Sequence, residues 1–464
     1  MIFNRLVDYK ILVVGLGISG MSSAIKLQLS KANVVCWDDD EAKRKKAIKR
    51  NLKIEKLDDI NFKQINLVLL SPGIPSTGKK KHLVIKLAVK YNCKIISDLE
   101  LLEYTSRKIK KIGVTGTNGK STTSKMIEHI IKNSKKNVHL AGNIGIPVAD
   151  LELNKSKESP ILVIEASSFQ LERVIKLRFD IALVLNLSED HLDRHFSVEK
   201  YLEAKSNIFN NQNKYDYSIV CIDDKVCENL AKELKCSHKS KIVEISTNQK
   251  LSNGIFLKET KNKLNIFNEI DKKKLEIKKS DIKLFGSHNN QNILACYTVC
   301  KILNIEDSKF LKGISNFDSL EHRLENFKNF QNVCFFNDSK STNLSSSKVA
   351  LRSLKNIFWL VGGRSKIGGL IGIDNYLRNV KKAFIFGEAK KEFSETLYNK
   401  IEIELFDDLN KASEAAFSQA LRINQKVNIV LSPACSSFDQ FKNFEERGSE
   451  FKKNINNKIS NLIE

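Results

Sequence analysis

The sequence predicts an α/β protein of three domains, each built on a mostly parallel sheet covered by helices. Short runs rich in β-branched and aliphatic residues alternate with longer amphipathic stretches along all 464 residues, which is typical of βαβ units. Glycine-rich turns follow two of these runs, and each turn precedes a predicted helix. At roughly 100–200 residues per domain, the length allows two to four domains.

The predicted strands fall into three groups, which favours three sheets over one. They lie at residues 11–14, 34–37, 67–71 and 94–97; then 112–115, 161–165, 181–185 and 217–221; then 333–337, 358–361, 383–386 and 427–431. Polar segments at 105–111 and 315–321 separate the groups, and the Lys-rich stretch 239–283 is read as small strands and loops. The predicted domains are 1–106, 107–319 and 320–464, of which the first and third are Rossmann-like.

The net charge of +23 comes from 77 Lys and Arg residues against 54 Asp and Glu residues. A protein that binds nucleic acid usually gathers such charge into a patch with interleaved aromatic residues. Here the lysines are spread over every predicted helix, and Asn and Ile are also abundant, as A/T-rich codons would produce. We therefore favour codon bias over nucleic-acid binding and expect small-molecule partners.

Other features of composition bear on the compartment. No apolar run approaches the roughly 18 residues of a membrane span, and the first residues run into a strand without a signal-peptide pattern. The expected location is the cytoplasm, without membrane contact. The nine cysteines form no CxxC pair, which argues against a zinc ribbon, a thioredoxin-type site or a disulfide framework and predicts buried thiols.

The first glycine-rich turn comprises Gly15, Gly17, Ile18, Ser19 and Gly20. It follows an apolar strand and opens a helix, and the next strand ends at Asp38. Glycines allow a tight turn against a diphosphate, the helix N-terminus stabilises the anion, and an acid about 20 residues on can bind a ribose hydroxyl. NAD and UDP-linked ligands fit this pattern equally, and the alternative is that the glycines merely tighten the turn.

The second turn runs from Gly116 through Thr117, Asn118 and Gly119 to a predicted helix start at Lys120. Backbone N–H groups there can cradle phosphates, Lys120 can reach β/γ oxygens, and the Ser121 hydroxyl can coordinate Mg²⁺. The segment departs from the usual G-x4-GK[ST] spacing, because Val114 stands five residues before Gly119. It nevertheless has the working parts of a P-loop, which makes the central domain P-loop-like.

Two later strand ends carry further polar groups. Glu165 ends one strand and is placed to bind Mg²⁺ beside the P-loop, unless it is simply a solvated carboxylate. His191 lies in Asp190-His-Leu-Asp193 after the next strand and is either a metal ligand or a structural histidine. Since carboxyl ends of parallel strands meet at one sheet edge, these groups and Lys120 should lie together.

At this point the sequence resembles the Mur ligase family of peptidoglycan synthesis. Its motifs occur in the family's order over essentially the whole chain: GTNGKST from Gly116, the Glu165 segment, Asp190-His191-Leu-Asp193, Gly286-Ser-His288-Asn289-x-x-Asn292, Glu321-His322-Arg323 and Asn337-Asp338-Ser-Lys340. Within the family, the segments 337–343 and 431–448 resemble members that add D-glutamate to UDP-N-acetylmuramoyl-L-alanine. A DNPR-type segment, expected of diaminopimelate-adding members, is missing.

The resemblance implies an ATP- and Mg²⁺-dependent ligase that proceeds through an acyl phosphate. It implies UDP-substrate, ATP and amino-acid binding by the first, central and third domains, and monomer is the default expectation. The alternatives are a folylpolyglutamate synthase-like ligase, which should lack the full first domain, and an NAD-binding protein with a vestigial P-loop.

The resemblance also assigns roles to residues. Catalysis is assigned to Lys120, Glu165, His191 and Lys205, and two Mg²⁺ ions to Ser121, Glu165, His191 and Lys205, the last if carbamylated rather than an ordinary helix-surface lysine. ATP contacts are assigned to Gly116, Thr117, Asn118, Gly119, Lys120, Ser121, Thr122, Asn289, Asn292, Arg323 and Asp338, although both asparagines could instead cap a helix.

The other two ligands are assigned in the same way. UDP-substrate contacts fall on Gly17, Ile18, Ser19, Gly20, Asp38, Gly73 and Asn143, and D-glutamate contacts on Lys340, Thr342, Lys366, Ser437 and Phe444. The acids Asp39 and Asp40, which follow Asp38, depart from the neutral or basic residue expected near a diphosphate.

Overall fold

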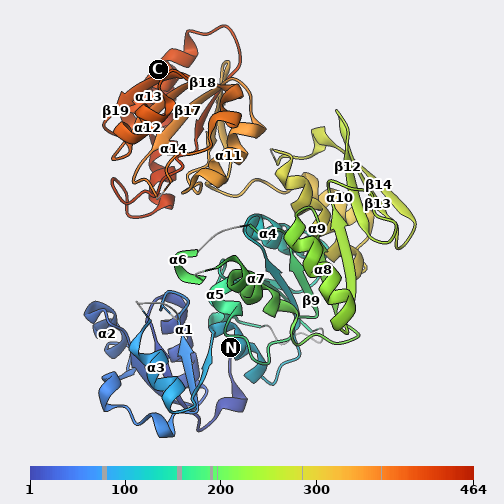
Figure 1. Cartoon of the computed structure of the whole chain (residues 1–464), viewed down its shortest axis with the longest axis vertical. Coiled ribbons are helices and arrows are strands. Elements are labelled where there is room, and N and C mark those ends of the chain that lie inside the picture. The colour runs from blue at the N-terminus through green and yellow to red at the C-terminus, as the bar shows by residue number, and fades with distance from the viewer. Residues whose placement is uncertain are drawn as a thin grey trace. The chain divides into compact units, whose positions relative to one another are not determined.

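The computed structural model describes residues 1–75, 81–153, 159–188, 192–195, 197–284, 286–366 and 368–463. The chain forms two compact units, one of Met1–Asp281 with Asn290–Ser315 and one of Ile282–Asn289 with Asn316–Glu464. The first unit contains two sheets and the second contains one (Figure 1). The three predicted domain ranges stay a prediction, since the first two sheets share one unit.

The first sheet has five parallel strands in the order β3-β2-β1-β4-β5. Their bounds are β1 Lys10–Val14, β2 Asn33–Trp37, β3 Lys53–Ile54, β4 Leu67–Leu70 and β5 Lys94–Ile96, and the helices are α1 Ile18–Leu29, α2 Glu41–Ile48 and α3 Leu83–Lys90. Strand order reverses between β1 and β4. Ligands of open α/β sheets bind at such a reversal, beyond the carboxyl ends of the strands.

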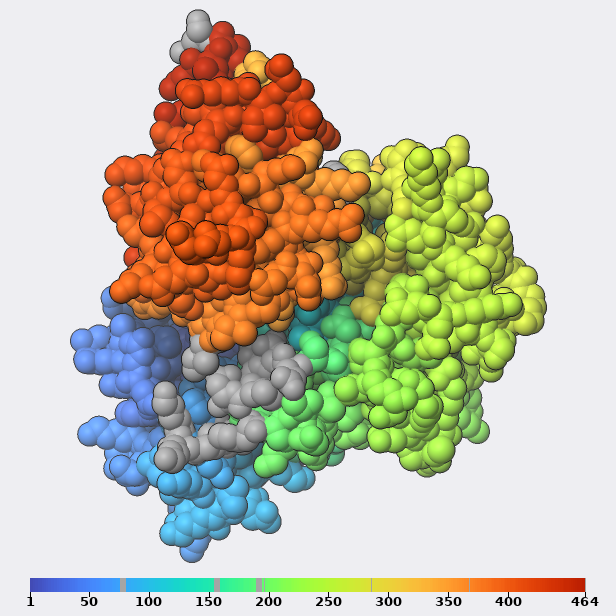
Figure 2. Space-filling view, turned by 45° about the horizontal axis from the view of Figure 1, so that its top comes forward, coloured from blue at the N-terminus to red at the C-terminus, as the bar shows by residue number. Residues whose placement is uncertain are grey.

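The second sheet has nine strands in the order β14-β13-β12-β11-β10-β9-β6-β8-β7. Their bounds are β6 Lys110–Thr115, β7 Val138–Gly142, β8 Ile161–Glu165, β9 Ile181–Val184, β10 Tyr217–Cys221, β11 Lys241–Ser246, β12 Ile255–Glu259, β13 Lys263–Asn268 and β14 Lys273–Lys278. The strands from β7 to β12 are parallel, whereas β12, β13 and β14 pair antiparallel. These last strands, yellow-green in Figure 2, lie at the surface of the first unit.

Helices of the second sheet's region follow its strands in chain order. They are α4 Lys120–Asn133, α5 Ser168–Leu171, α6 Leu192–His195, α7 Val198–Ser206, α8 Lys225–Ser237, α9 His288–Ile302 and α10 Asp307–Ser315. The helix start predicted at Lys120 is confirmed. The order reverses around β6, which has β8 on one side and β9 on the other, so the P-loop after β6 lies at a ligand-binding position.

The third sheet, orange to red in Figure 1, has the order β15-β16-β20-β17-β18-β19. Its elements are β15 Glu325–Phe330, β16 Val333–Asn337, β17 Ile357–Gly362, β18 Val380–Phe386, β19 Glu402–Phe406 and β20 Val427–Leu431, with α11 Leu344–Ser353, α12 Lys390–Leu397, α13 Leu409–Leu421 and α14 Phe444–Ile463. Two apolar clusters cover its faces, one with α11 and α12 and the other with α13 and α14. The sheet is therefore covered by helices on both sides.

Burial corrects one expectation about the cysteines. Seven of the nine are buried as predicted, but Cys93 is only half-buried and Cys236 is exposed. Cys236 lies near the end of the amphipathic helix α8, where periodicity places it on the solvent side. Among the described residues, no helix combines the length and the apolar character that a membrane crossing requires.

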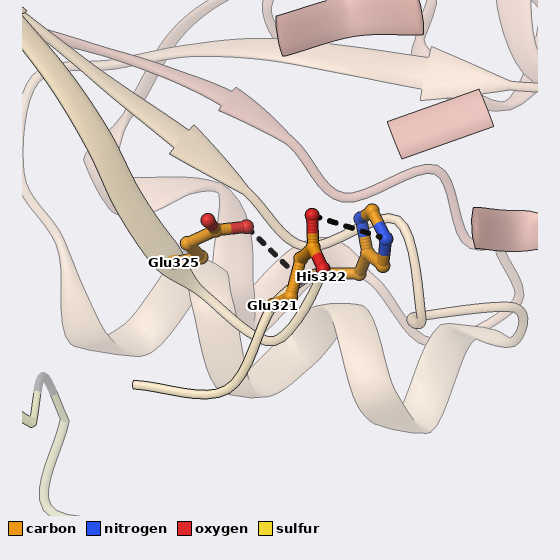
Figure 3. Close-up of side chains that lie close together, drawn as sticks. All are labelled: Glu321, His322 and Glu325. Carbon is orange, nitrogen blue, oxygen red and sulfur yellow. Dashed lines mark hydrogen bonds and ion pairs between the residues drawn. The ribbon is translucent and has the colours of Figure 1, made fainter. Parts of the chain in front are cut away.

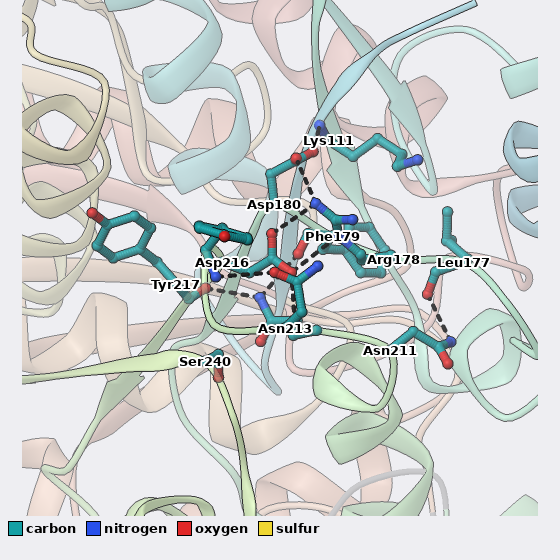
Figure 4. Close-up of polar contacts among 12 residues, drawn as sticks. Lys111, Leu177, Arg178, Phe179, Asp180, Asn211, Asn213, Asp216, Tyr217 and Ser240 are labelled. Atoms are coloured by element: carbon teal, nitrogen blue, oxygen red, sulfur yellow. Dashed lines mark hydrogen bonds and ion pairs between the residues drawn. The ribbon is translucent and has the colours of Figure 1, made fainter.

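Polar side chains stabilise the amino ends of three strands in the second sheet (Figure 4). Asp180, which precedes β9, accepts a hydrogen bond from the backbone N–H of Lys111 in β6 at 2.7 Å. The guanidinium of Arg178 contacts the buried carboxylate of Asp216, which precedes β10, at 3.0 Å. This network lies at the edge opposite the P-loop, so it supports the sheet without taking part in the site.

A buried carboxylate joins the first two sheets. Glu100 is fully buried and accepts backbone hydrogen bonds from Ile175, Lys176 and Leu177 at 3.0, 2.7 and 3.1 Å. Nearby, the Gln170 amide donates to the buried Asp98 at 3.0 Å. Hydrogen bonds to a charged acceptor stabilise more than neutral ones, so Glu100 fixes the segment 175–177 against the first sheet.

We predict that Glu100→Ala lowers the free energy of unfolding by about 2–4 kcal/mol, because three backbone N–H donors lose a buried charged acceptor. Urea denaturation would measure this loss. Glu41→Ala is the control, since Glu41 is exposed and forms an ion pair with Lys45 of its own helix, and we expect a change under roughly 0.5 kcal/mol. Equal losses of stability in the two variants would contradict the role of Glu100 as the acceptor that holds the segment 175–177.

Candidate active site

The loop after β6 has the backbone shape of a phosphate cradle. Gly116 and Gly119 have φ angles of +150° and +82°, which non-glycine residues avoid, and Gly119 directly precedes α4. A Cβ on Gly119 would also collide with the side-chain oxygen of Asn292. The loop thus leads directly into the N-terminus of α4, and a glycine-rich loop before a helix N-terminus is the arrangement that binds phosphate.

Two lysines converge on one carbonyl of this loop. Lys120 Nζ donates to the carbonyl oxygens of Gly116 and Thr117 at 2.8 and 2.9 Å. Lys205, from α7, donates from Nζ to the same Gly116 oxygen at 2.7 Å and lies 4.8 Å from the Tyr201 ring centre. Lys205 is only 2% exposed, so the expectation of an ordinary surface lysine is wrong. Two ammonium groups at one partly buried carbonyl leave an excess of positive charge, which an anionic group would offset.

Glu165 lies on the other side of β6, at the end of β8. It is 1% exposed, and its Oε1 accepts a hydrogen bond from Asn143 Nδ2 at 2.7 Å. Its Oε2 is buried and has no hydrogen-bond partner within the described part of the chain. A solvated strand-end carboxylate is therefore ruled out. A buried carboxylate oxygen left open beside a phosphate loop fits a Mg²⁺ ligand, with the Ser121 hydroxyl as a second oxygen donor.

The end of β9 supplies contacts that sequence reasoning did not single out. Asn186 receives a hydrogen bond from the Asn118 N–H at 2.8 Å and donates to the Asn118 carbonyl at 3.2 Å. The Thr117 and Tyr201 hydroxyls lie 3.2 Å apart. An asparagine directly after an apolar strand was the available signal for Asn186. His191 lies outside the described residues.

Further residues assigned to ATP lie on α4 and α9. Thr122 is half-buried in the first turn of α4. Asn292 is 2% exposed and accepts a hydrogen bond from the Thr123 hydroxyl at 3.1 Å, which ties α9 to the P-loop helix. Asn289 is buried at the second position of α9. An adenine contact for either asparagine stays a prediction.

The glycine turn of the first sheet is held by Asp38 and Ser71. The Asp38 carboxylate is buried and accepts from the N–H groups of Leu16 and Asp40 at 2.6 and 2.9 Å, while the Ser71 hydroxyl donates to the Gly15 carbonyl at 2.6 Å. Asp38 thus shapes the turn itself, and a ribose contact would use its remaining acceptor capacity. Of the other assigned positions, Gly17, Ile18 and Gly73 are exposed and Ser19 is half-buried.

The two acids after Asp38 have local partners that explain their presence. Asp40 caps α2 by accepting from the Ala42 N–H at 2.9 Å. Asp39 accepts from Trp37 Nε1 at 2.9 Å and contacts His82 Nε2 at 3.2 Å. Burial alone would raise the pKa of Asp39, but these hydrogen bonds and the nearby positive charge lower it. The unexpected negative charge is therefore offset locally.

In the second unit, two residues assigned to D-glutamate lie together. Lys340 Nζ is 3.8 Å from the ring centre of Phe444, a cation–π distance. A backbone bridge between Arg364 and Ser436 brings the loop of the exposed Lys366 beside the buried Ser437. Thr342 is half-buried near Lys340, whose carbonyl its N–H contacts at 2.8 Å.

Arg447 lies beneath this loop cluster and was given no role by the sequence. It is fully buried and donates to the Ser339 carbonyl and hydroxyl, both at 2.9 Å, and to the Cys435 carbonyl at 3.1 Å. Burial lowers the pKa of Arg447 to about 10, so it stays charged at neutral pH. It joins the loops after β16 and β20.

Asp338, assigned to ATP, is an internal anchor in this unit. Its Oδ1 accepts from the Leu324 N–H at 3.0 Å, and its Oδ2 accepts from the Ser341 and Ser432 hydroxyls at 2.5 and 2.8 Å. These bonds join the segment that carries Arg323, which is half-buried, to the carboxyl ends of β16 and β20. Any ATP contact of Asp338 or Arg323 stays a prediction.

Glu321, His322 and Glu325 form a cluster with metal-ligand chemistry (Figure 3). Lys452 already contacts it, however, with Nζ 2.5 Å from Glu321 and 3.1 Å from Glu325. The His322 Nδ1 atom is 2.9 Å from Asn337 Nδ2. An ammonium group thus provides the positive charge that a metal would otherwise supply.

Comparison with known proteins agrees with this fold. The Mur ligase middle domain model matches residues 114–300. A UDP-N-acetylmuramoylalanine--D-glutamate ligase of Rickettsia felis is 40% identical over 97% of both chains, and that of Rickettsia bellii is 39% identical over 95% of both.

Solved structures share the fold at low identity. The UDP-N-acetylmuramate-alanine ligase MurC of Thermotoga maritima gives a TM-score of 0.60 at 16% identity and covers 97% of this chain and 99% of its own. The MurF ligase of Thermotoga maritima in complex with ADP gives 0.58 at 18% identity over 86% of this chain and 97% of its own. Fold, phosphate loop and relatives together define an ATP-dependent, amide-forming ligase. The chain belongs to the Mur ligase family.

We predict a pH-dependent stability that arises from Asp338. Burial raises its pKa from 3.8 to about 6, although hydrogen bonds from Ser341 and Ser432 oppose the rise. The folded state therefore binds this proton more tightly than the unfolded state does, and the free energy of unfolding falls by roughly 2–3 kcal/mol as pH rises from 4 to 6.

Urea denaturation between pH 4 and 7 would reveal this contribution as the difference between wild type and Asp338→Asn, which should lack it. Asp318→Asn is the control, because the Asp318 carboxylate is exposed and forms a surface ion pair with Lys283 at 2.8 Å. The same pH dependence in wild type and Asp338→Asn would argue against a buried, protonatable Asp338.

Proposed function

We propose that this chain uses ATP to join D-glutamate to UDP-N-acetylmuramoyl-L-alanine in peptidoglycan precursor synthesis. The observation that carries the proposal is the convergence of Lys120 and Lys205 on the Gly116 carbonyl, beside the buried and partly unsatisfied Glu165. Relatives named for this reaction share 39–40% identity over nearly the full length, which supports the substrates.

The chemistry requires an activated carboxylate, since oxide is a poor leaving group. Phosphorylation of the L-alanyl carboxylate gives an acyl phosphate, which the amine of D-glutamate attacks with loss of phosphate. Negative charge on the transferring group must be offset by fixed positive groups. Lys120 and the N–H groups at the start of α4 are placed to do this for the β- and γ-phosphates.

Ser121 and Glu165 would hold one Mg²⁺ ion, which supplies charge neutralisation when bound. Both residues are buried, Ser121 in the first turn of α4 and Glu165 at the end of β8, so their oxygens are pre-positioned and lose little freedom on binding. His191 is proposed as a ligand of a second ion.

Lys205 is proposed to act as a carbamate. A free ammonium group here would lie beside Lys120 and repel a metal ion, whereas a carbamate is an anionic oxygen ligand. Carbamylation would also replace the hydrogen bonds that Lys205 donates to Gly116 and Thr115 at 2.7 and 3.4 Å. The Gly116 carbonyl would then accept from Lys120 alone.

The acceptor would bind in the second unit. Lys340 and Lys366 provide cations for the two carboxylates of D-glutamate, Ser437 and Thr342 provide hydroxyl donors, and the Phe444 ring positions the Lys340 side chain. The first sheet would hold UDP at the glycine turn, with Gly73 and Asn143 toward the muramoyl part. A full nucleotide-binding first sheet speaks against a folylpolyglutamate synthase-like activity.

We expect phosphate release from ATP only when UDP-N-acetylmuramoyl-L-alanine and D-glutamate are both present. A coupled phosphate assay with D-glutamate, L-glutamate, D-alanine and meso-diaminopimelate in turn would measure it. Turnover with another amino acid but not with D-glutamate would refute the acceptor, and turnover without the UDP substrate would refute the donor.

We expect Lys205→Ala to lose at least about 100-fold in kcat, because a metal ligand is removed from the phosphoryl-transfer site. A short carboxylic acid such as formate or acetate should restore part of this activity by supplying the missing carboxylate. Lys200→Ala is the matched control, since Lys200 is exposed on the same helix, and it should keep wild-type kcat. Full activity of Lys205→Ala would show that no carbamate is needed.

A further inference from the structure

Two arginines from the second sheet's region contact one carbonyl of the first sheet's region. The Ile74 oxygen accepts from Arg173 Nη2 at 3.3 Å and from Arg194 Nη2 at 2.6 Å. Ile74 belongs to the loop 71–75, which follows β4 and includes Gly73. This loop borders the glycine turn, to which the Ser71 hydroxyl bonds at 2.6 Å. The arginines therefore hold the loop expected to contact the UDP-linked substrate.

Arg173 makes further contacts with the same segment. Its Nη1 donates to the carbonyl oxygens of Leu70 and Ser71 at 3.3 and 3.4 Å, so one planar guanidinium contacts three carbonyl acceptors at and just after the end of β4. Its backbone oxygen accepts from the Ser97 N–H, at the end of β5. Arg173 is 6% exposed, and burial lowers its pKa to about 10, which leaves it charged at neutral pH.

Both arginines belong to a packed cluster that continues from Glu165. Helix α5 begins three residues after Glu165 and ends two residues before Arg173. The Arg194 guanidinium lies 4.3 Å from the ring centre of Phe169 in α5. His195, next to Arg194, is buried with Nε2 2.9 Å from the Ser168 hydroxyl. The α5 and α6 segments thus connect the proposed metal ligand to the loop 71–75.

A guanidinium group is well suited to hold backbone segments at a fixed distance. Its five donors lie in a rigid plane, so a contact with three carbonyls defines their position, which a flexible lysine with a point charge does not. Catalysis is sensitive to such spacing, because a displacement of about 1 Å between reacting groups can cost 100-fold in rate. A substrate held by its nucleotide at one end must present its carboxylate at a set distance.

We propose that Arg173 and Arg194 fix the distance between the loop 71–75 and the phosphoryl-transfer site, and so select the length of the UDP-linked carboxylate that is phosphorylated. They act as positioning residues and touch no reacting atom. The inference rests on the proposed function, because it takes the first sheet as the UDP site and Glu165 and Lys120 as the phosphoryl-transfer site.

The test compares two substrates that differ in length by one amino acid, UDP-N-acetylmuramoyl-L-alanine and UDP-N-acetylmuramate. The ratio of kcat/KM for the first substrate to kcat/KM for the second would be measured for wild type, Arg173→Lys and Arg194→Met. Calorimetry would measure the binding of UDP and ADP by the same three proteins. Arg173→Lys keeps the buried charge but not the three-acceptor geometry, and Arg194→Met removes a half-buried group whose loss the fold should tolerate.

Arg178→Met is the matched control. It removes another arginine of the first unit that contacts carboxylates, Asp216 and Asp180, at the opposite edge of the sheet (Figure 4). We expect it to keep the wild-type ratio.

In both test variants we expect kcat/KM for the longer substrate to fall at least tenfold. The value for the shorter substrate and the affinities for UDP and ADP should change less than threefold. The UDP site and the phosphoryl-transfer site would then each be intact while the distance between them has changed. General destabilisation would not produce this result.

Three results would overturn the inference. One is an unchanged substrate ratio in both variants with intact UDP and ADP binding. Another is a parallel fall of kcat/KM for both substrates and of the affinities for UDP and ADP, which would indicate a structural role only. The third is a wild type that does not distinguish the two substrates. If wild type does not bind UDP, the proposed function itself fails, and the inference fails with it.

Discussion

The carbonyl of Gly116 accepts hydrogen bonds from Lys120 and Lys205, and much of the site depends on this contact. It exists because Gly116 has a φ of +150°, which turns the chain sharply after β6. The lysines come from α4 and α7, so neither helix can shift without breaking the contact. Lys120, together with the N–H groups at the start of α4, supplies the positive charge that favours phosphate at this edge of the sheet.

The loops of the other two sheets are held by the same kind of interaction, a buried charged side chain bonded to backbone. Asp38 fixes the glycine turn through the Leu16 N–H, and Asp338 fixes the segment before β15 through the Leu324 N–H. Arg447 joins the loops after β16 and β20. Charged hydrogen bonds are strong and directional, so each loop is set before a ligand arrives and less ordering entropy is lost on binding.

Much of the fold followed from local pattern. The strands at 161–165, 217–221, 333–337 and 427–431 were predicted to the residue, because they are short apolar runs buried on both faces. The exposed or half-buried strands were harder to predict from the sequence. Strands β15 and β19 were missed, since charged and polar residues interrupt their apolar pattern. The strands β12 to β14 were expected only as small strands, and they prove to extend the central sheet.

Sequence alone determined the two glycine turns and the placement of Lys120 and Glu165 after successive strands, because these features depend on spacing along the chain. The family followed from the same features. Tertiary structure decided which side chains meet. Asn186 reaches the P-loop across 68 residues, Arg447 reaches Ser339 across 108, and Arg173 reaches Leu70 across 103. Such contacts are set by strand order and burial, and no local pattern encodes them. Burial also decided the state of Glu165 and Lys205, whose types would suit a solvated surface equally well.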